Sequence, residues 1–253
     1  MTLEVDLKSW AGIENDGDGV TLAVAFTDIM DSTKLANTVG NQAMFALLRK
    51  HFERARVHCS FHRGFEIKLI GDGYMAAFRT AADALQFALA FRQDTGDHQI
   101  SIRVGIDQGK VRIWENDIYG LMVNFAARLL HSNLKDEEGI YISNATQREI
   151  ISEYGKSPEG FRVVPLGRSR PMKGFNNSEP VYQVVSPDLR RARQARQQRG
   201  TGSPAPSLAR GTTTPPELRP PQTKSQPRWM TEMRRVSLPD PPLLNPRRKP
   251  DDK

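Results

Sequence analysis

The sequence predicts an α+β fold with a ferredoxin-like βαββαβ-type core, helices over one face of its sheet, and a disordered C-terminal tail. Strand and helix patterns alternate along the first 185 residues, and two pairs of neighbouring strand patterns are separated only by turn residues. Hairpins mixed with strand–helix–strand crossovers are typical of a sheet covered by helices. An abrupt change of composition after residue 185 predicts the tail.

The tail differs from the rest of the chain in charge and proline content. Residues 186–253 hold 15 of the 36 lysines and arginines, 6 of the 29 acidic residues and 13 of the 17 prolines. Such a segment buries too little apolar surface to offset the entropy of ordering it. We therefore expect an N-terminal lead-in at 1–19, one folded domain at 20–185 and a disordered Pro/Arg-rich tail at 186–253.

Several classes of protein are disfavoured by composition. No stretch approaches the roughly 20 apolar residues of a transmembrane helix, and the N-terminus has no signal-peptide pattern. The single cysteine, Cys59, excludes an internal disulfide and suits the cytoplasm. The basic runs lie in the tail and are expected to be solvated, so no specific nucleic-acid partner is predicted. An RNA-binding ferredoxin-like module would also need aromatic strand residues that stack on bases, and these are missing.

The first strand is predicted at Val20 to Phe26, a continuous apolar and β-branched run typical of a strand buried on both faces. It ends at Thr27-Asp28-Ile29-Met30-Asp31-Ser32-Thr33. Either Asp31 or Ser32 can cap a short helix. A longer helix with apolar residues at helical spacing follows Gly40 and runs to about His62.

The next element is a hairpin in the stretch FEIKLIGDGYMAAF. Its strands are predicted at residues 65–70 and 74–78, joined by the turn Gly71-Asp72-Gly73. Such a turn holds Asp72 rigidly at its tip, although aspartate is also a routine turn former.

The remaining elements alternate in the same way. A second hairpin is expected from strands 100–106 and 111–114, turning near Gln108-Gly109. Helices are predicted at 81–92, 120–131 and 144–154, and further strands at 139–143, 161–166 and 181–185.

Two carboxylates form the first candidate site. Asp28 and Asp72 each stand where an apolar strand turns outward, so adjacent strands would bring them close together. Oxygen ligands of this kind suit Mg²⁺ or Mn²⁺, and two such ions are the usual arrangement for displacement at phosphorus. The backbone amides of residues 29–33 lead into a helix N-terminus, which favours a bound triphosphate.

A second candidate pair lies on a later helix. Asn124 and Arg128 are four residues apart and so share one helix face. An amide and a guanidinium together can orient a ribose and neutralise charge that develops on a phosphoryl group. Taken singly, Asn124 is better explained by a structural hydrogen bond and Arg128 by a solvated surface position.

Four segments, in this order and at these separations, resemble the catalytic domain of class III nucleotidyl cyclases. They are FTDIMDST, IKLIGDGYMAAF, RVGIDQGKV and DIYGLMVNFAARL. The resemblance spans roughly residues 20–185 and includes the later segment PMKGF. It implies a nucleotidyl cyclase with two Mg²⁺ or Mn²⁺ ions per site and a nucleoside triphosphate as substrate.

The resemblance also implies a role for each matching residue. Asp28 and Asp72 correspond to the metal-binding acids, with the carbonyl of Ile29 as a further ligand. The other positions are Thr33 and Lys173 for the triphosphate, Lys68 and Asp117 for the base, and Asn124 and Arg128 for the ribose and the transition state.

The base-reading residues favour ATP. Adenine presents an N1 acceptor beside an N6 donor, which a lysine donor and an aspartate acceptor complement. Guanine presents the reverse pattern and would leave both side chains unpaired. Leu121 and Met122 depart from the family pattern after Tyr-Gly, so a cyclase that makes cyclic UMP, cyclic CMP or cyclic GMP stays open. A catalytically silent nucleotide-binding regulatory domain is a further alternative.

The spacing of Lys68 and Asp72 calls for a second chain. Four residues of strand span about 13 Å, too short for one segment to grip both the base and the phosphate ends of one nucleotide. A homodimer resolves this, because one protomer can supply Asp28 and Asp72 while the other supplies Lys68, Asp117, Asn124 and Arg128. We therefore expect a homodimeric adenylate cyclase that converts ATP to 3′,5′-cyclic AMP and pyrophosphate.

Overall fold

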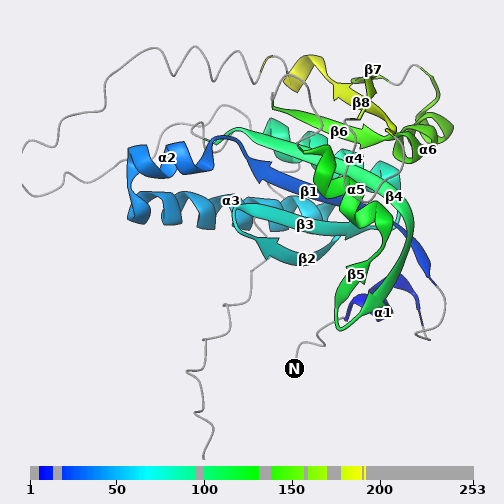
Figure 1. The fold of residues 1–253 in the computed structure, drawn as a ribbon, viewed down its shortest axis with the longest axis horizontal. Coiled ribbons are helices and arrows are strands. Elements are labelled where there is room, and N and C mark those ends of the chain that lie inside the picture. Colours follow the sequence, from blue (N-terminus) through cyan, green and yellow to red (C-terminus); the bar gives the residue numbers. More distant parts are fainter. Residues whose placement is uncertain are drawn as a thin grey trace, which may run out of the picture. The chain divides into compact units, whose positions relative to one another are not determined.

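A computed structural model describes residues 6–13, 19–94, 100–130, 138–156, 159–169, 178–189 and 191. All of these belong to one compact unit (Figure 1). The predicted tail beyond residue 191 and the loop at 170–177, which contains Lys173, lie outside the described residues. Within the described ranges, no helix has the length and apolar character needed to cross a membrane.

One sheet organises the domain, with the strand order β2-β3-β1-β4-β6-β8-β7 and β5 paired to β4. Neighbouring strands are antiparallel except for β4 and β6, which are parallel. The strands are β1 Val20–Ile29, β2 Phe65–Ile70, β3 Gly73–Phe78, β4 Ile102–Trp114, β5 Asp117–Tyr119, β6 Gly139–Ser143, β7 Arg162–Arg168 and β8 Pro180–Val185.

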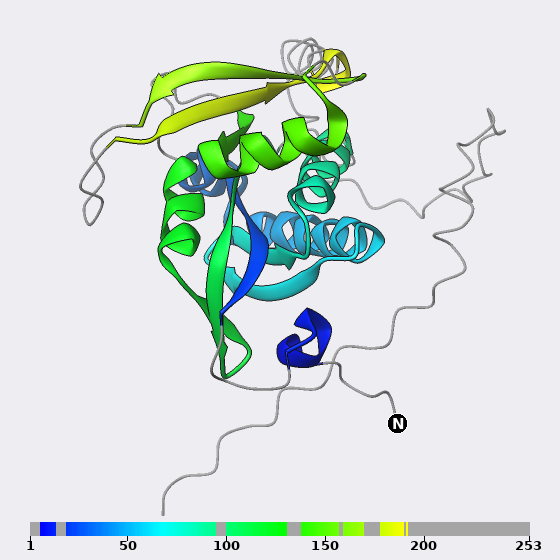
Figure 2. The same cartoon turned by 90° about the vertical axis from the view of Figure 1, so that its right-hand side faces the viewer.

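Helices cover both faces of this sheet, so the expectation of helices over one face is wrong (Figures 1 and 2). The core between the sheet and helices α3, α4 and α6 contains Ala23 and Ala25 of β1. Leu22 and Val24, which alternate with them, pack with α1 and α5 on the opposite face. The helices are α1 Leu7–Ala11, α2 Ser32–Val39, α3 Asn41–Phe61, α4 Ala81–Gln93, α5 Leu121–Leu129 and α6 Asn144–Tyr154.

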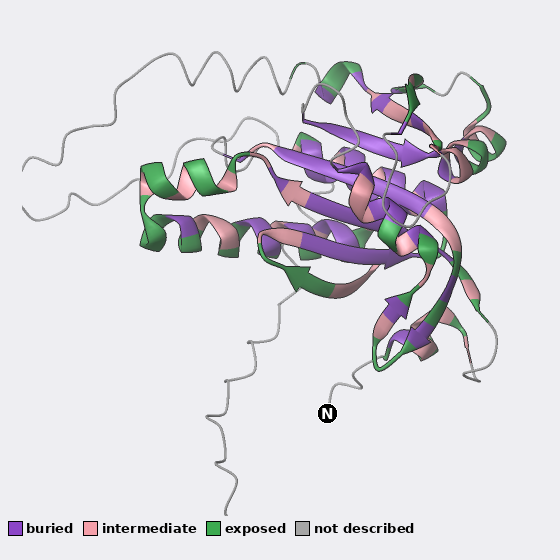
Figure 3. Cartoon of the chain, viewed as in Figure 1, coloured by how far each residue is buried: buried purple, intermediate pink, exposed green. Residues whose placement is uncertain are grey.

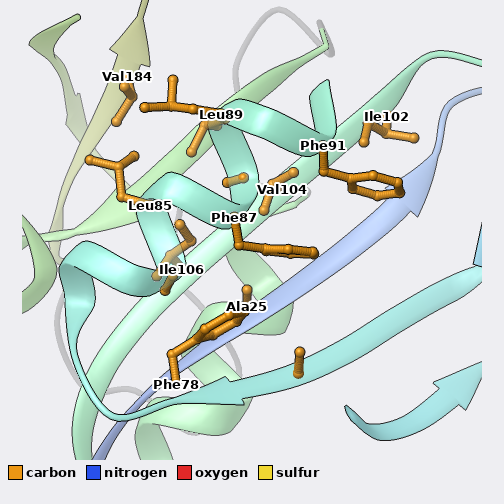
Figure 4. Close-up of a cluster of buried hydrophobic side chains, with 14 of the residues drawn as sticks. Ala25, Phe78, Leu85, Phe87, Leu89, Phe91, Ile102, Val104, Ile106 and Val184 are labelled. Atoms are coloured by element: carbon orange, nitrogen blue, oxygen red, sulfur yellow. The ribbon is translucent and has the colours of Figure 1, made fainter. Parts of the chain in front are cut away.

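The larger core explains why β1 is apolar without alternation. Figure 4 shows Ala25 beneath the aromatic side chains of α4, with Phe87 and Phe91 stacked at 5.6 Å between ring centroids. Colouring by burial shows the central strands almost wholly buried (Figure 3). A strand with two covered faces needs apolar residues at every position.

The predicted hairpin at Gln108-Gly109 does not exist. Instead β4 is one continuous strand that pairs with β1 from Val20↔Val111 to Ile29↔Ile102. Gln108-Gly109 has turn-forming residues, but ten paired residues of β1 lie opposite β4 and hold it extended. The chain turns later, at Glu115 and Asn116, which both have positive φ (48° and 57°).

The other predicted helices and strands form close to their expected positions, whereas α1 and β5 were not predicted. Helix α2 differs from the prediction in how its N-terminus is capped. Asp31 occupies the N-cap position of α2, yet its backbone is left-handed (φ 53°) and its side chain makes no capping hydrogen bond. Asp31 therefore turns the chain after β1 through its backbone, and the predicted side-chain cap by Asp31 or Ser32 is wrong.

Candidate active site

The end of β1 and the tip of the β2–β3 hairpin meet at one edge of the sheet. Thr27 pairs with Tyr74, and the Tyr74 amide donates a hydrogen bond to Thr27 Oγ1 at 3.3 Å. The hairpin turns through two residues, Gly71 and Asp72, and Gly71 has the positive φ (63°) that glycine adopts without strain. Asp28, the next residue of β1, therefore lies beside the turn that carries Asp72.

Arg103 is a member of this group that the sequence-based prediction missed. It lies directly opposite Asp28 in the β1–β4 ladder, and its Nη2 is 2.5 Å from Asp28 Oδ2. Only 9% of Arg103 is exposed. A guanidinium held in this position orients the Asp28 carboxylate. Pairing register, which places Arg103 across from Asp28, was the missing signal.

The surroundings of Asp72 fit a cation ligand. Its Oδ2 atom is removed from solvent and has no hydrogen-bond donor among the residues that the structure describes. A buried carboxylate oxygen without a partner is costly, so such an atom calls for a cation or a donor. No group of three or more His, Cys, Asp or Glu side chains gathers in the described ranges. Two carboxylates and a backbone carbonyl, completed by substrate phosphates, fit Mg²⁺ or Mn²⁺ without such a cluster.

The two-residue turn and a β-bulge in β2 together place Lys68 and Phe65 on one face of the sheet. Counting back from the turn, Lys68 pairs with Met75, on the face where α1 and α5 pack. Register then shifts between Lys68 and Glu66, which pairs with Ala76, so that Ile67 is the extra residue. Without this bulge Phe65 would pair with Phe78, which faces α3 and α4, whereas the bulge puts Phe65 opposite Ala77, on the same face as Lys68.

Lys68 forms an ion pair on that face with Asp117, through Nζ and Oδ2. Asp117 begins β5, opposite Trp114, on the β4–β5 arm (residues 112–119). Its other oxygen, Oδ1, accepts a hydrogen bond from the Ile118 amide at 2.9 Å. Both predicted base-reading residues thus belong to one chain and contact each other, and each remains partly exposed to a ligand.

The other predicted residues occupy different surroundings. Asn124 is exposed on α5, and Arg128 is half-buried one turn later. Helix α5 crosses β4 so closely that a Cβ on Gly105 would collide with the Ala126 carbonyl. Thr33 is exposed in the first turn of α2. Neither Asn124 nor Thr33 is hydrogen-bonded to the carboxylates or to the Lys68–Asp117 pair in the described part of the chain.

Comparison with known proteins identifies the family. A sequence model of the adenylate and guanylate cyclase catalytic domain matches residues 17–184, which is more than half of the chain and includes every site residue named above. The chain belongs to the adenylate and guanylate cyclase catalytic domain family. The resemblance to class III cyclases is therefore confirmed, and the family supports a nucleotidyl cyclase.

Solved structures confirm the predicted α+β cyclase fold. The adenylyl cyclase CyaB from P. aeruginosa has a TM-score of 0.57 at 23% identity, over 66% of this chain and 95% of that one. The catalytic core of a rhodopsin-guanylyl cyclase with converted specificity, in complex with ATPalphaS, also has a TM-score of 0.57. It is 25% identical, over 67% of this chain and 97% of that one.

Curated relatives carry the name adenylate cyclase. The Neurospora crassa adenylate cyclase is 27% identical over 221 residues, covering 64% of this chain and 10% of the relative. The Streptomyces coelicolor adenylate cyclase is 27% identical over 133 residues, covering 51% of this chain and 34% of the relative. The chain therefore spans only a minor part of the length of these relatives.

The cyclase domain also buries a carboxylate on β4, away from the residues above. Asp107 is 6% exposed, and burial raises its pKa to about 6 although hydrogen bonds from Ser143 Oγ and the Gln108 amide lower it. Ser143 also accepts the Thr146 amide at 3.1 Å as the N-cap of α6. Asp107 therefore ties β4 to the start of α6.

Proposed function

We propose that the chain is an adenylate cyclase that converts ATP to 3′,5′-cyclic AMP and pyrophosphate in a homodimer. The Lys68–Asp117 ion pair carries this proposal, because it presents one donor and one acceptor side by side on a partly exposed surface. Adenine offers an acceptor at N1 beside a donor at N6, and the pair can exchange its own contact for these two. Guanine offers the opposite pattern and would leave both groups unsatisfied.

The opposite end of the substrate is assigned to Asp28, Asp72 and the carbonyl of Ile29. Two Mg²⁺ or Mn²⁺ ions bound there would lower the pKa of the ribose 3′-hydroxyl and neutralise phosphate charge. Arg103 adds a fixed positive charge beside Asp28. The amides at the start of α2, with Thr33, and Lys173 are proposed to hold the triphosphate.

A homodimer is proposed because the carboxylates and the base-reading pair lie near different ends of β4 in one chain. Arg103, beside Asp28, lies near the start of β4, whereas Trp114, beside Asp117, is its last residue. On the neighbouring hairpin, Lys68 and Asp72 are four residues apart, about 13 Å, which is too short for one segment to grip both ends of one nucleotide. Two antiparallel copies related by a two-fold axis would bring the base-reading pair of one copy to the carboxylates of the other.

Exposed apolar residues mark the surface that a second copy would cover. Trp114 is 56% exposed, Tyr119 48% and Leu121 70%, and all three flank Asp117 or begin α5. Large apolar side chains gathered beside a site are typical of a protein–protein interface. In such a dimer Asn124 and Arg128 would reach the ribose and the transferring phosphoryl group of the partner's site.

A different base specificity is the second candidate. Leu121 and Met122, which follow the Tyr119-Gly120 pair, replace the usual polar or small residues of the family, and Met122 is buried on the inner side of α5, between that helix and the sheet. An apolar wall beside Asp117 would narrow the base pocket, which favours a smaller pyrimidine. A cyclase for UTP, CTP or GTP would keep the same phosphate chemistry.

Product analysis tests the proposal. The purified chain is incubated with Mn²⁺ and each of ATP, GTP, CTP and UTP, and the cyclic nucleotides are separated by chromatography. We expect cyclic AMP as the main product, and Asp72→Asn should abolish it. Asp83→Asn is the matched control, because Asp83 pairs with Arg63 beyond the far end of β3. No product from any nucleotide would refute a catalytic role and leave a silent nucleotide-binding domain.

The single cysteine supports a proposal for the compartment. Cys59 is free, 2% exposed, and its pKa is raised by burial. A buried protonated thiol behaves as a small apolar side chain and needs no oxidising environment. We propose the cytoplasm, where nucleoside triphosphates and Mg²⁺ would be available to the site.

A further inference from the structure

The short helix α1 is a well-defined structure although it has only five residues. Asp6 caps its N-terminus, with Oδ1 accepting a hydrogen bond from the Ser9 amide at 2.8 Å. Gly12 ends it with φ 74°, and the Ile13 amide returns to the Lys8 carbonyl at 3.0 Å. Isolated helices of this length do not persist in water, so α1 depends on caps and on packing.

The first packing partner of α1 is the β4–β5 arm (Figures 1 and 2). Leu7 is fully buried and shares a cluster with Ile113 and Ile118 of the arm. The Leu7 amide, one of the free donors in the first turn, donates to Asn116 Oδ1 at 3.2 Å. Asn116 immediately precedes Asp117 in the sequence.

The second partner of α1 is the start of β2. Trp10 packs against Phe65 with 5.5 Å between ring centroids. Arg79 fixes Trp10 further, since its Nε donates to the Trp10 carbonyl at 3.1 Å and its guanidinium lies over the indole ring. Phe65 opens the strand that carries Lys68. Helix α1 thus contacts both strands that supply the base-reading pair.

The arm needs this support. Its strand β5 has three residues and pairs with β4 alone in the described part of the sheet. A two-stranded ribbon is marginally stable in water unless an apolar face is covered. Ile113 and Ile118 are 8% and 3% exposed, whereas Trp114 on the other side of the arm is 56% exposed. The buried side is the one that faces α1.

We propose that α1 is a positioning element for the Lys68–Asp117 pair and that Asn116 is the residue through which it holds the arm. The proposal rests on the proposed function, because it assigns α1 an effect on base recognition. Loss of the attachment lets Asp117 move relative to Lys68, so base contacts weaken while the residues at the phosphate end remain in place. Neither Asn116 nor α1 needs to touch the substrate.

Matched variants separate this role from general stability. Asn116→Gly keeps the left-handed conformation of the turn but removes the acceptor, while Asn116→Asp keeps both. Leu7→Ala removes the apolar contact. Ser9→Ala is the control on α1, because the Ser9 side chain is exposed and its capping contact uses the backbone amide.

Two measurements decide the proposal. Asn116→Gly and Leu7→Ala should raise KM for ATP about five- to tenfold with kcat changed less than about twofold, and should narrow the preference for ATP over GTP by a similar factor. Hydrogen exchange of the amides in residues 112–119 should accelerate about tenfold in the same variants. The variants Asn116→Asp and Ser9→Ala should change neither the KM for ATP nor the exchange rate of the arm by more than about twofold.

The outcomes that overturn the proposal are distinct from failure of the proposed function. Unchanged exchange in the arm would show that α1 does not hold it, and faster exchange with unchanged KM and base preference would show that it does not position the pair. If Leu7→Ala fails to fold, Asn116→Gly decides alone, because it leaves the apolar packing intact. If the unsubstituted chain makes no cyclic nucleotide, the proposed function and the base-positioning role both fail, whereas exchange still reports the attachment.

Discussion

Mixing two inactive variants gives the sharpest test of a composite site. Lys68→Ala removes the base donor and Asp72→Ala removes a metal ligand, so each homodimer should have two defective sites and no activity. In a heterodimer, one site takes its carboxylates from the Lys68→Ala chain and its base-reading pair from the Asp72→Ala chain. That site is intact, while the other site carries both defects.

The expected recovery follows from counting. Equal amounts of the two variants, unfolded together and refolded, give heterodimers in half of the molecules, and each heterodimer has one working site of two. Activity should therefore reach about a quarter of that of the unsubstituted protein at the same total concentration. Cyclic AMP formation with Mn²⁺ and ATP is the assay, and size-exclusion chromatography checks that dimers have formed.

The structure supplies a matched control for this experiment. Lys68 and Asp117 contact each other within one chain, so Lys68→Ala and Asp117→Ala damage the same half of the site. A mixture of these two variants should stay inactive, because every base-reading pair is then incomplete. The assignment of residues to the two halves would be refuted if the first mixture were no more active than the separate variants. Recovery of activity in the control mixture would also refute it.

Three further predictions concern stability and packing. The folded state holds an extra proton on Asp107 between about pH 4 and pH 6. Because of this raised pKa, the free energy of unfolding falls by about 3 kcal/mol as pH rises through that window. In urea unfolding, the Asp107→Asn variant should lose correspondingly less of its free energy of unfolding between about pH 4.5 and pH 7.5. Glu138→Ala breaks a buried ion pair with Arg92, whose Nη2 is 3.1 Å from Glu138 Oε2, and should lower the free energy of unfolding by about 3–5 kcal/mol in the same assay. Gly105→Val places side-chain atoms against the α5 backbone and should cost about 1–3 kcal/mol, measured by thermal melting, with cyclase activity lost because α5 is displaced.

Local patterns were enough to predict the parts of the fold that depend on neighbouring residues. The hairpin around Gly71 follows from turn chemistry and apolar runs, and the structure has it where the patterns place it, whereas β1 runs three residues past its predicted end at Phe26, to Ile29. Helices α3, α4 and α6 likewise follow from apolar spacing. In each case the residues that determine the element lie within it.

Long-range pairing was not predictable in the same way. The continuity of β4 through Gln108 depends on β1, and the proximity of Arg103 to Asp28 depends on the register between those strands. The order within α1 depends on Asn116, which is 109 residues away from Leu7. No local pattern carries this information, because each contact is decided by a segment distant in the sequence.

The bulge at Ile67 has a consequence for how relatives of this chain are compared. The two-residue turn sets Lys68 opposite Met75, and the extra residue lets Phe65, three positions earlier, lie on the same face of the sheet. A homologous chain that lacks one residue between Phe65 and Lys68 would therefore keep both side chains on their present faces, because regular pairing then replaces the bulge. A difference of one residue in length at this point is thus compatible with the same contacts to α1 and Asp117.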